Sequence, residues 1–251
     1  SRTGHAGFLA KDSPLYNMNH KHRGKCIVFN HENPEFRRSI YRDCSSVDAS
    51  RIKQTFQKLG FDVEILKDLK YEKIMEKIIE LSEANHEDSD CICIFMLTHG
   101  SPDASDENVI CADNEIWKPF AGDNCKTLVG KPKLFFFQTC RGAGDAKTFS
   151  YTIPIYADFL ISHSTVTGFC FWDNVIKGKW FIQHLCDVLD QSANTTDLLK
   201  MLTITAQKAA AAPSFDFWFS SDKVPSTMSM LLRDVYFTPK QEYSSDRSDT
   251  Q

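Results

Sequence analysis

The sequence lacks the features that mark several large classes of protein. No apolar stretch reaches the roughly 18 residues that a membrane-spanning helix needs. The first residues, from Ser1 to His5, lack the apolar core of a secretory signal peptide. The net charge is −4, so no broad basic surface favours binding to nucleic acid. These absences predict a cytoplasmic protein that binds neither membranes nor nucleic acids.

Paired cysteine motifs are also missing. The chain has nine cysteines, an odd number, and no Cys-x-x-Cys pair, so the sequence gives little support to a zinc site or a dithiol redox site. Most of these cysteines sit within apolar runs, which fits reduced thiols in the cytosol. We therefore expect no metal site and no cofactor.

The sequence does contain an alternation of strand-like apolar runs and amphipathic helical patterns. For example, Ile52, Phe56 and Leu59 recur at helical spacing, and Gly60 ends that pattern. Strands alternating with helices predict an α/β fold, in which a parallel sheet has helices on both faces. The predicted strands are residues 25–29, 61–66, 91–97, 133–138, 156–165 and 227–232; the predicted helices are 47–59, 71–84, 178–190 and 194–211, with a short helical stretch or loop in 117–128 and with Thr195 or Thr196 as the cap of the last helix.

Two of the apolar runs end in residues that can do chemistry. The run 133–138 is followed by Cys140, and the run 91–97 is followed by His99 and Gly100. Ligands bind beyond the carboxyl ends of the strands in open parallel sheets, so both side chains are expected at one edge. A cysteine nucleophile needs a base to form its thiolate, and a histidine at a neighbouring strand end can supply it.

The segment Gln138-Thr139-Cys140-Arg141-Gly142 resembles the signature around the catalytic cysteine of the caspases, with Thr in place of Ala. Further stretches resemble executioner-type caspases in the family's order along nearly the whole chain. They are residues 16–24, 27–31, 130–133, 153–160, 180–183 and 224–237.

This resemblance implies a caspase-like, mainly parallel six-stranded sheet in a three-layer sandwich. It also divides the chain. The expected parts are a mobile N-terminal arm over residues 1–22, a part like the caspase large subunit over 23–142, a link over 143–152, a part like the small subunit over 153–240 and a disordered tail over 241–251. Caspases are cut after Asp in the link. Asp145 is the only Asp there and is the candidate processing site, unless the link is an uncut surface loop.

For catalysis, the resemblance implies that Cys140 is the nucleophile and that His99 is its proton-transfer partner. The backbone amides of Cys140 and Gly100 would stabilise the oxyanion. In the family, the strand corresponding to 227–232 pairs with its copy in a second chain, so a homodimer or a heterodimer with an active caspase is expected.

Caspases cleave after Asp and hold that side chain with two Arg and one Gln. Arg42 matches the first Arg and Gln138 matches the Gln, but Asp173 stands where the second Arg is usual. A carboxylate at that position repels an acidic substrate and could pair with Arg42. A unit charge pair at about 4 Å is worth about 4 kcal/mol at an effective dielectric constant near 20. The substitution therefore predicts weak binding of Asp.

Neighbouring positions of this predicted pocket also differ from the family. Phe171 replaces a Ser, and its bulk is expected to crowd the edge to which an extended peptide adds. Trp172 and Trp180 are candidates to line pockets for substrate residues, or else pack in the core. Lys179 replaces a small residue and is interpreted as a solvated surface charge, on which no prediction rests.

Three hypotheses follow. The first is a caspase homologue that keeps its Cys–His dyad, hydrolyses Asp peptides poorly or not at all, and acts by pairing with an active caspase. The second is an active cysteine endopeptidase with altered specificity, favouring a basic or neutral residue. The third is a structural or scaffold domain. Cleavage assays with Asp-ended and Lys-ended peptides separate them.

Overall fold

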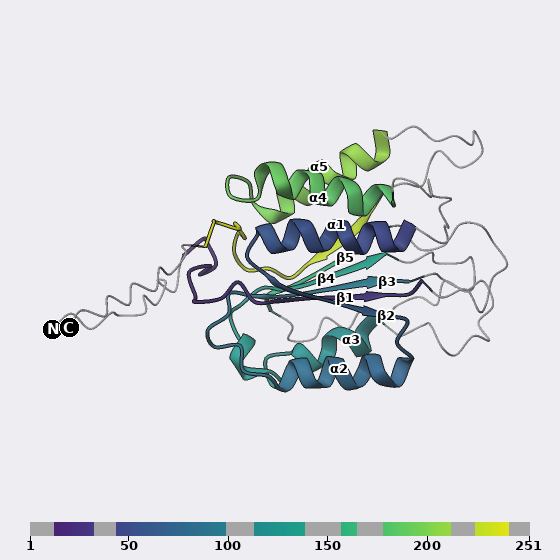
Figure 1. Cartoon of the computed structure of the whole chain (residues 1–251). Coiled ribbons are helices and arrows are strands. Elements are labelled where there is room, and N and C mark those ends of the chain that lie inside the picture. The colour runs from purple at the N-terminus through teal and green to yellow at the C-terminus, as the bar shows by residue number, and fades with distance from the viewer. Residues whose placement is uncertain are drawn as a thin grey trace, which may run out of the picture.

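A six-stranded sheet runs through the centre of the molecule (Figure 1). The computed structural model describes residues 13–32, 44–98, 113–138, 157–164, 178–211 and 224–240. The strands lie in the order β2-β1-β3-β4-β5-β6, with β1 to β5 parallel and β6 antiparallel to β5. Their bounds are β1 (Lys25–Asn30), β2 (Asp62–Lys67), β3 (Ile92–Leu97), β4 (Lys133–Gln138), β5 (Phe159–His163) and β6 (Ser226–Ser229). The predicted mainly parallel α/β sheet is confirmed.

Helices cover both faces of this sheet (Figure 1). On one face lie α1 (Cys44–Lys58), α4 (Trp180–Ser192) and α5 (Leu198–Ala211), and on the other lie α2 (Tyr71–Glu83) and α3 (Asp113–Trp117). Short 3-10 turns follow at Lys118–Phe120 and Lys126–Leu128. None of the helices in the described ranges is both long enough and apolar enough to span a bilayer.

The central strands are apolar on both faces because both faces are covered. Every residue of β3 and β4 is buried. Alternate residues enter two separate cores: Phe95 and Phe136 stack with ring centroids 4.7 Å apart on one face, and Phe135 stacks on Phe159 on the other. Continuous apolar runs of this kind are typical of parallel strands.

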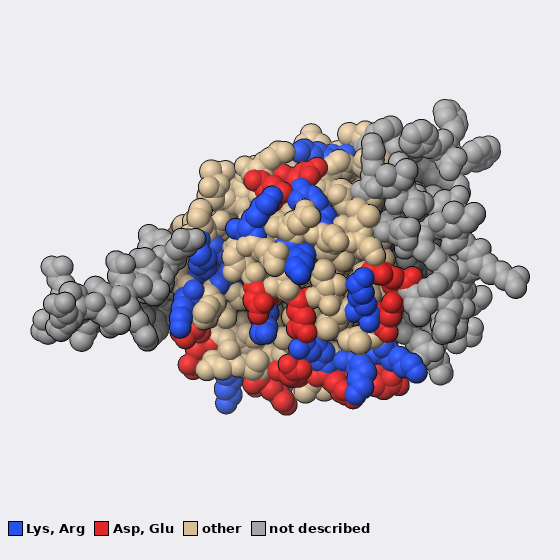
Figure 2. All heavy atoms as spheres, in the orientation of Figure 1, with Lys and Arg blue, Asp and Glu red and all other residues tan. Residues whose placement is uncertain are grey.

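Basic and acidic side chains are interspersed on the face of the molecule shown in Figure 2, and neither sign gathers into a broad patch there. No group of three or more His, Cys, Asp or Glu side chains arranged to hold a metal occurs among the residues that the structure describes.

The strand register brings the ends of the central strands together. Asn30 lies beside Leu97, and Leu97 lies beside Gln138. The amide of Thr98 donates to the carbonyl of Gln138 at 3.1 Å, which extends the pairing one residue past β3. The carboxyl ends of β1, β3 and β4 therefore lie side by side, at the edge where parallel sheets bind ligands.

The structure differs from the sequence prediction at the start of α5. Thr195 and Thr196 do not cap this helix. The carboxylate of Asp197 caps it, accepting hydrogen bonds from the amides of Leu199 at 2.9 Å and Lys200 at 3.4 Å. Both Thr and Asp are good capping residues, so local sequence could not choose between them.

Residues 13–22, the described part of the predicted N-terminal arm, lie against the body of the molecule. Tyr16 and Met18 are buried, and the Tyr16 hydroxyl donates to Asp158 at 2.8 Å. The Tyr16 amide donates to the carbonyl of Asp234 at 3.1 Å. Polar composition suggested a free arm, whereas two buried side chains are enough to dock this segment.

Lys133 predicts a pH dependence of stability. Its side chain is 1% exposed at the start of β4, and burial lowers the pKa of its ammonium to about 8, although Asp158 at 3.8 Å opposes the shift. Between pH 8 and 10.5 the unfolded chain binds more protons at this residue, so its contribution to stability rises with pH and is flat below 8.

We expect the difference in unfolding free energy between the wild type and Lys133→Met to shift in favour of the wild type by roughly 2–3 kcal/mol across that window. Urea unfolding at several pH values measures this difference. The cysteines are the same in both proteins, so their effect on the unfolding free energy cancels in the difference. A constant difference would contradict the prediction.

Candidate active site

The ends of three parallel strands supply polar groups at one edge of the sheet. Thr98 follows β3, Gln138 ends β4, and Ser164 follows β5. The Gln138 side-chain amide donates from Nε2 to Ser164 Oγ at 2.8 Å, so β4 and β5 are joined through their terminal side chains. The predicted His99 and Cys140 come directly after Thr98 and Thr139 in the sequence.

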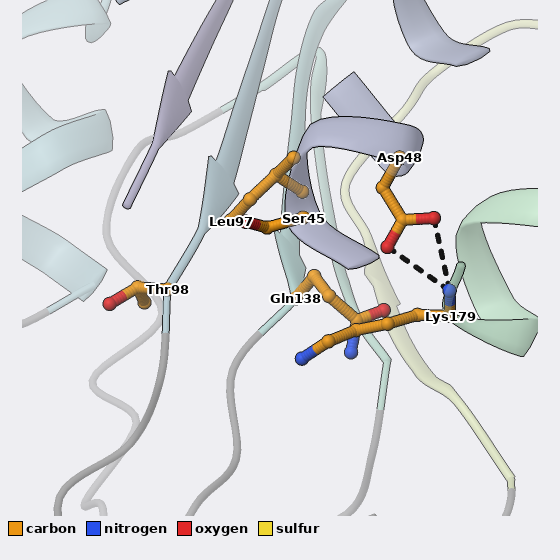
Figure 3. Close-up of a pocket in the computed structure, with 6 residues that line it drawn as sticks. All are labelled: Ser45, Asp48, Leu97, Thr98, Gln138 and Lys179. Carbon is orange, nitrogen blue, oxygen red and sulfur yellow. Dashed lines mark hydrogen bonds between the residues drawn. The ribbon is translucent and has the colours of Figure 1, made fainter. Parts of the chain in front are cut away.

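A small pocket lies at this edge, between the strand ends and the first turns of two helices (Figure 3). It holds about 180 Å³ of space, counting open solvent at its mouth. Most of this space is open to solvent, and the lining atoms enclose no room for even a water-sized sphere. The pocket is lined by Ser45, Asp48, Leu97, Thr98, Gln138 and Lys179.

Asp48 fixes the wall of the pocket that α1 and α4 share. Its buried carboxylate accepts hydrogen bonds from the Lys179 amide at 3.0 and 3.1 Å (Figure 3). It also accepts one from Gln183 Nε2 at 2.7 Å. The amides at a helix N-terminus have no partner within the helix, and a carboxylate is favoured there by the helix dipole. Asp48 therefore holds the start of α4 against α1.

Gly178 makes this junction possible. Its φ is +79°, and a Cβ built on it would lie 2.3 Å from Asp48 Oδ1 and 2.4 Å from Gln183 Nε2. A side chain at residue 178 would be strained by that φ and would collide with both groups. The glycine thus sets the backbone direction of the next residue, Lys179.

The sequence-based interpretation of Lys179 as a solvated surface charge is wrong. Lys179 is 4% exposed and lines the pocket. Its side chain leaves the Asp48 junction and extends beside Gln138, so that its ammonium lies at the far end from Asp48 (Figure 3). The sequence offered one hint, a lysine directly after Gly178 where the family has a small residue. The direction of the lysine side chain could not be known without the contacts of Asp48 with the start of α4.

Gln138, a predicted specificity residue, is 6% exposed and lines the pocket (Figure 3). Its Oε1 atom, Ser45 Oγ and Thr98 Oγ1 are buried and have no hydrogen-bond partner among the described residues.

Trp180, a candidate for lining substrate pockets, is the first residue of α4 and is half-buried. Its ring stacks on His184 with centroids 5.6 Å apart. The other predicted site residues lie outside the described residues: Arg42, His99, Gly100, Cys140, Asp145, Phe171, Trp172 and Asp173.

Five described cysteines are buried, and three of them are poor nucleophiles. Cys26, Cys91, Cys93, Cys125 and Cys186 are free and buried. Burial raises the pKa of the Cys91 and Cys93 thiols, and raises the pKa of Cys186 to about 12. A thiolate is the reactive form, so Cys91, Cys93 and Cys186 remain inert at neutral pH.

Comparisons with known proteins decide the family. The family model of the caspase domain matches residues 23–236. The chain belongs to the caspase family.

Relatives of this caspase align with most of its length. It is 37% identical to Caspase-1 of Spodoptera frugiperda, over 93% of this chain and 84% of that protein. It is 36% identical to Caspase drICE of Drosophila melanogaster, over 90% of this chain and 73% of that protein. The crystal structure of Caspase-1 from Spodoptera frugiperda superposes with a TM-score of 0.82 at 38% identity, covering 94% of this chain and 97% of that one.

These matches confirm the caspase-like fold and the resemblance seen in the sequence. The fold implies protein substrates and, in general terms, association of caspase chains as dimers. It also places the caspase in a family of cysteine proteases.

Proposed function

We propose that this caspase acts in programmed cell death as a catalytically impaired homologue that regulates or activates an active caspase by pairing with it. Cys140 and His99 are both present, so a thiolate and a proton donor for the leaving amine are available. The amides of Cys140 and Gly100 would hold the oxyanion. We propose a cytoplasmic location for this activity.

The observation that carries the proposal is the charge at residue 173. Asp173 stands where the family has an Arg that binds the substrate Asp. Exchanging attraction for repulsion changes the binding free energy of an Asp side chain by more than about 4 kcal/mol before solvent screening. Even about 3 kcal/mol lowers affinity roughly a hundredfold, so hydrolysis after Asp is weak or absent.

The exposed edge of the sheet supports the pairing role. Strand β6 is the last strand of the sheet and pairs only with β5 among the described strands. Ser226 and Ser229 on β6 are exposed. An unpaired strand edge offers backbone groups to another chain, and the family pairs through this segment.

The pairing role is tested by mixing this caspase with an active relative, such as Caspase-1 of Spodoptera frugiperda, and measuring the relative's rate. We expect a complex and a changed rate. Ser229→Lys should weaken both because it places a charge on the pairing edge, whereas Ser229→Ala should not. Neither a complex nor a change in rate would remove the pairing role.

A second candidate is an active cysteine endopeptidase with weak or altered specificity. Lys179 supports this candidate, because its ammonium gives the pocket a cation that the sequence interpretation had not considered. The cation favours a neutral or acidic residue over a basic one. Cys140-dependent cleavage in a broad peptide library, absent in Cys140→Ala, would support this candidate, and no cleavage of any peptide would exclude it.

A further inference from the structure

We propose that residues 13–22, the N-terminal strap, control pairing by holding the chain directly after β6 in the conformation that a second caspase chain meets. Tyr16 is the positioning residue of this device. The inference rests on the proposed function, in which β6 is the edge that pairs, and it names what regulates that edge. Hydrogen bonds that join Tyr16, Asp158 and residues 230–232 carry it.

The Tyr16 hydroxyl bonds to two separate segments at once. It donates to Asp158 Oδ1 at 2.8 Å and accepts from the amide of Leu232 at 2.9 Å. Burial raises the pKa of this hydroxyl, so it stays protonated and able to donate at neutral pH. Tyr16 is 5% exposed, so water has little access to replace its hydroxyl in either bond.

Asp158 carries the link from Tyr16 to the end of β6. Its amide donates to the carbonyl of Met230 at 2.9 Å, and the amide of Met230 donates to the carbonyl of Phe159 at 2.8 Å. The φ of Asp158 is +72°, a conformation that a residue other than glycine keeps only where its surroundings impose it. Its second carboxylate oxygen accepts from the Gly130 amide at 3.2 Å, so bonds to both oxygens hold it there.

The strap and the last described segment lie side by side (Figure 1). The amide of Asp234 donates to the carbonyl of Pro14 at 2.8 Å, and Arg233 donates from Nε to the carbonyl of Ser13 at 2.9 Å. After residue 230 the chain leaves the sheet, and its amides at residues 232 and 234 find their acceptors on the strap. Backbone groups that lose such partners favour other conformations, so the strap selects one conformation for this segment.

The segment that the strap holds continues the pairing edge. Leu232 is 68% exposed, more than any other large apolar side chain that the structure describes. A strand edge binds a second chain through its backbone groups, so these groups must be in place before the chains meet. When Tyr16 releases Leu232, the fraction of molecules ready to pair falls, and the apparent dissociation constant of the pair rises in proportion.

Tyr16→Phe tests the inference because it removes only the hydroxyl. The labelled full-length chain is titrated with Caspase-1 of Spodoptera frugiperda, and fluorescence-detected sedimentation measures the dissociation constant of the complex. We expect Tyr16→Phe to raise this constant about 10-fold, within the range of one hydrogen bond to a charged group. Hydrogen exchange at the Leu232 amide, measured on the unpaired chain, should accelerate by a similar factor.

Tyr71→Phe is the matched control. The Tyr71 hydroxyl also bonds to a carboxylate, that of Glu115 at 2.6 Å, but this bond joins α2 to α3 and does not involve the strap. The control should pair as the wild type does. Arg233→Met removes the bond to Ser13 and should weaken pairing in the same direction as Tyr16→Phe, by a smaller factor.

Thermal melting of each variant checks that it is folded, and Arg233→Met decides the question if Tyr16→Phe melts early. Equal dissociation constants for the wild type and the strap variants would overturn the inference and leave the proposed pairing intact. An equal loss of pairing in Tyr71→Phe would also overturn it, because the effect would then not belong to the strap. If the wild type itself forms no complex, the proposed function fails too, so the behaviour of the wild type distinguishes the two failures.

Discussion

Asp173→Arg is expected to raise kcat/KM for a peptide with Asp before the scissile bond by about a hundredfold or more. Under the proposed function, the substitution removes a carboxylate that repels the substrate Asp and adds a guanidinium that can hold it through two parallel hydrogen bonds. Arg42 and Gln138, which match the family's other two recognition residues, are already present.

Asp173→Asn is the matched control, because it removes the repulsion and adds no attraction. We expect a gain of intermediate size. Each variant is assayed with and without Cys140→Ala, which should abolish turnover. No gain from Asp173→Arg would mean that other departures from the family limit activity more than charge does. These departures are Phe171, Thr139 and Cys44, the last of which stands where the family usually has Gly two places after the first recognition Arg.

Asp90→Ala is expected to lower the free energy of unfolding by about 3–5 kcal/mol, the cost of removing one partner from a buried ion pair. Asp90 is fully buried and accepts a hydrogen bond from Arg23 at 2.8 Å. It also accepts from the His20 amide at 2.8 Å and pairs with the Lys240 ammonium. Without Asp90, the buried Arg23 guanidinium loses its paired carboxylate.

This cluster joins distant parts of the chain. Arg23 also donates to the carbonyls of Leu59 and Thr238, and Lys240 donates to the carbonyls of Met18 and His20. The start of β1 is thereby tied to the end of α1 and to the last described segment. Loss of Asp90 should loosen all three together.

Asp62→Ala is the matched control for Asp90→Ala. Asp62 pairs with Lys25 at 3.6 Å, but its side chain is 77% exposed. Exposed pairs contribute at most about 1 kcal/mol, so this variant should unfold almost as the wild type does. Urea unfolding measures the loss of unfolding free energy in both variants. Equal losses would contradict the claim that the Asp90 ion pairs stabilise the fold more because they are buried.

The sheet could be predicted from the sequence because its strands are apolar on both faces. Residues 91–97 and 133–138 are runs without alternation, and such runs have few alternatives to a covered parallel strand. Their polar ends, Gln138 among them, meet at the edge where the sequence predicts the site. Strand boundaries shifted by a few residues, as at β5, because pairing and not composition ends a strand.

Residues whose role depends on tertiary contacts could not be predicted. Lys179 has the composition of a surface residue, and only the junction of Asp48 with Gly178 turns it inward. Tyr16 is held in its buried position by hydrogen bonds to the Asp158 carboxylate and the Asp234 carbonyl, two residues far away in the sequence. Neither periodicity nor a family motif carries that information.

The most direct test of the impaired pocket is the hydrolysis of an Asp-ended tetrapeptide by the wild-type chain, side by side with Caspase-1 of Spodoptera frugiperda at equal concentration. The account predicts a kcat/KM at least about a hundredfold lower than that of the relative, because the charge opposite the substrate Asp is reversed. Comparable turnover that disappears in Cys140→Ala would contradict it.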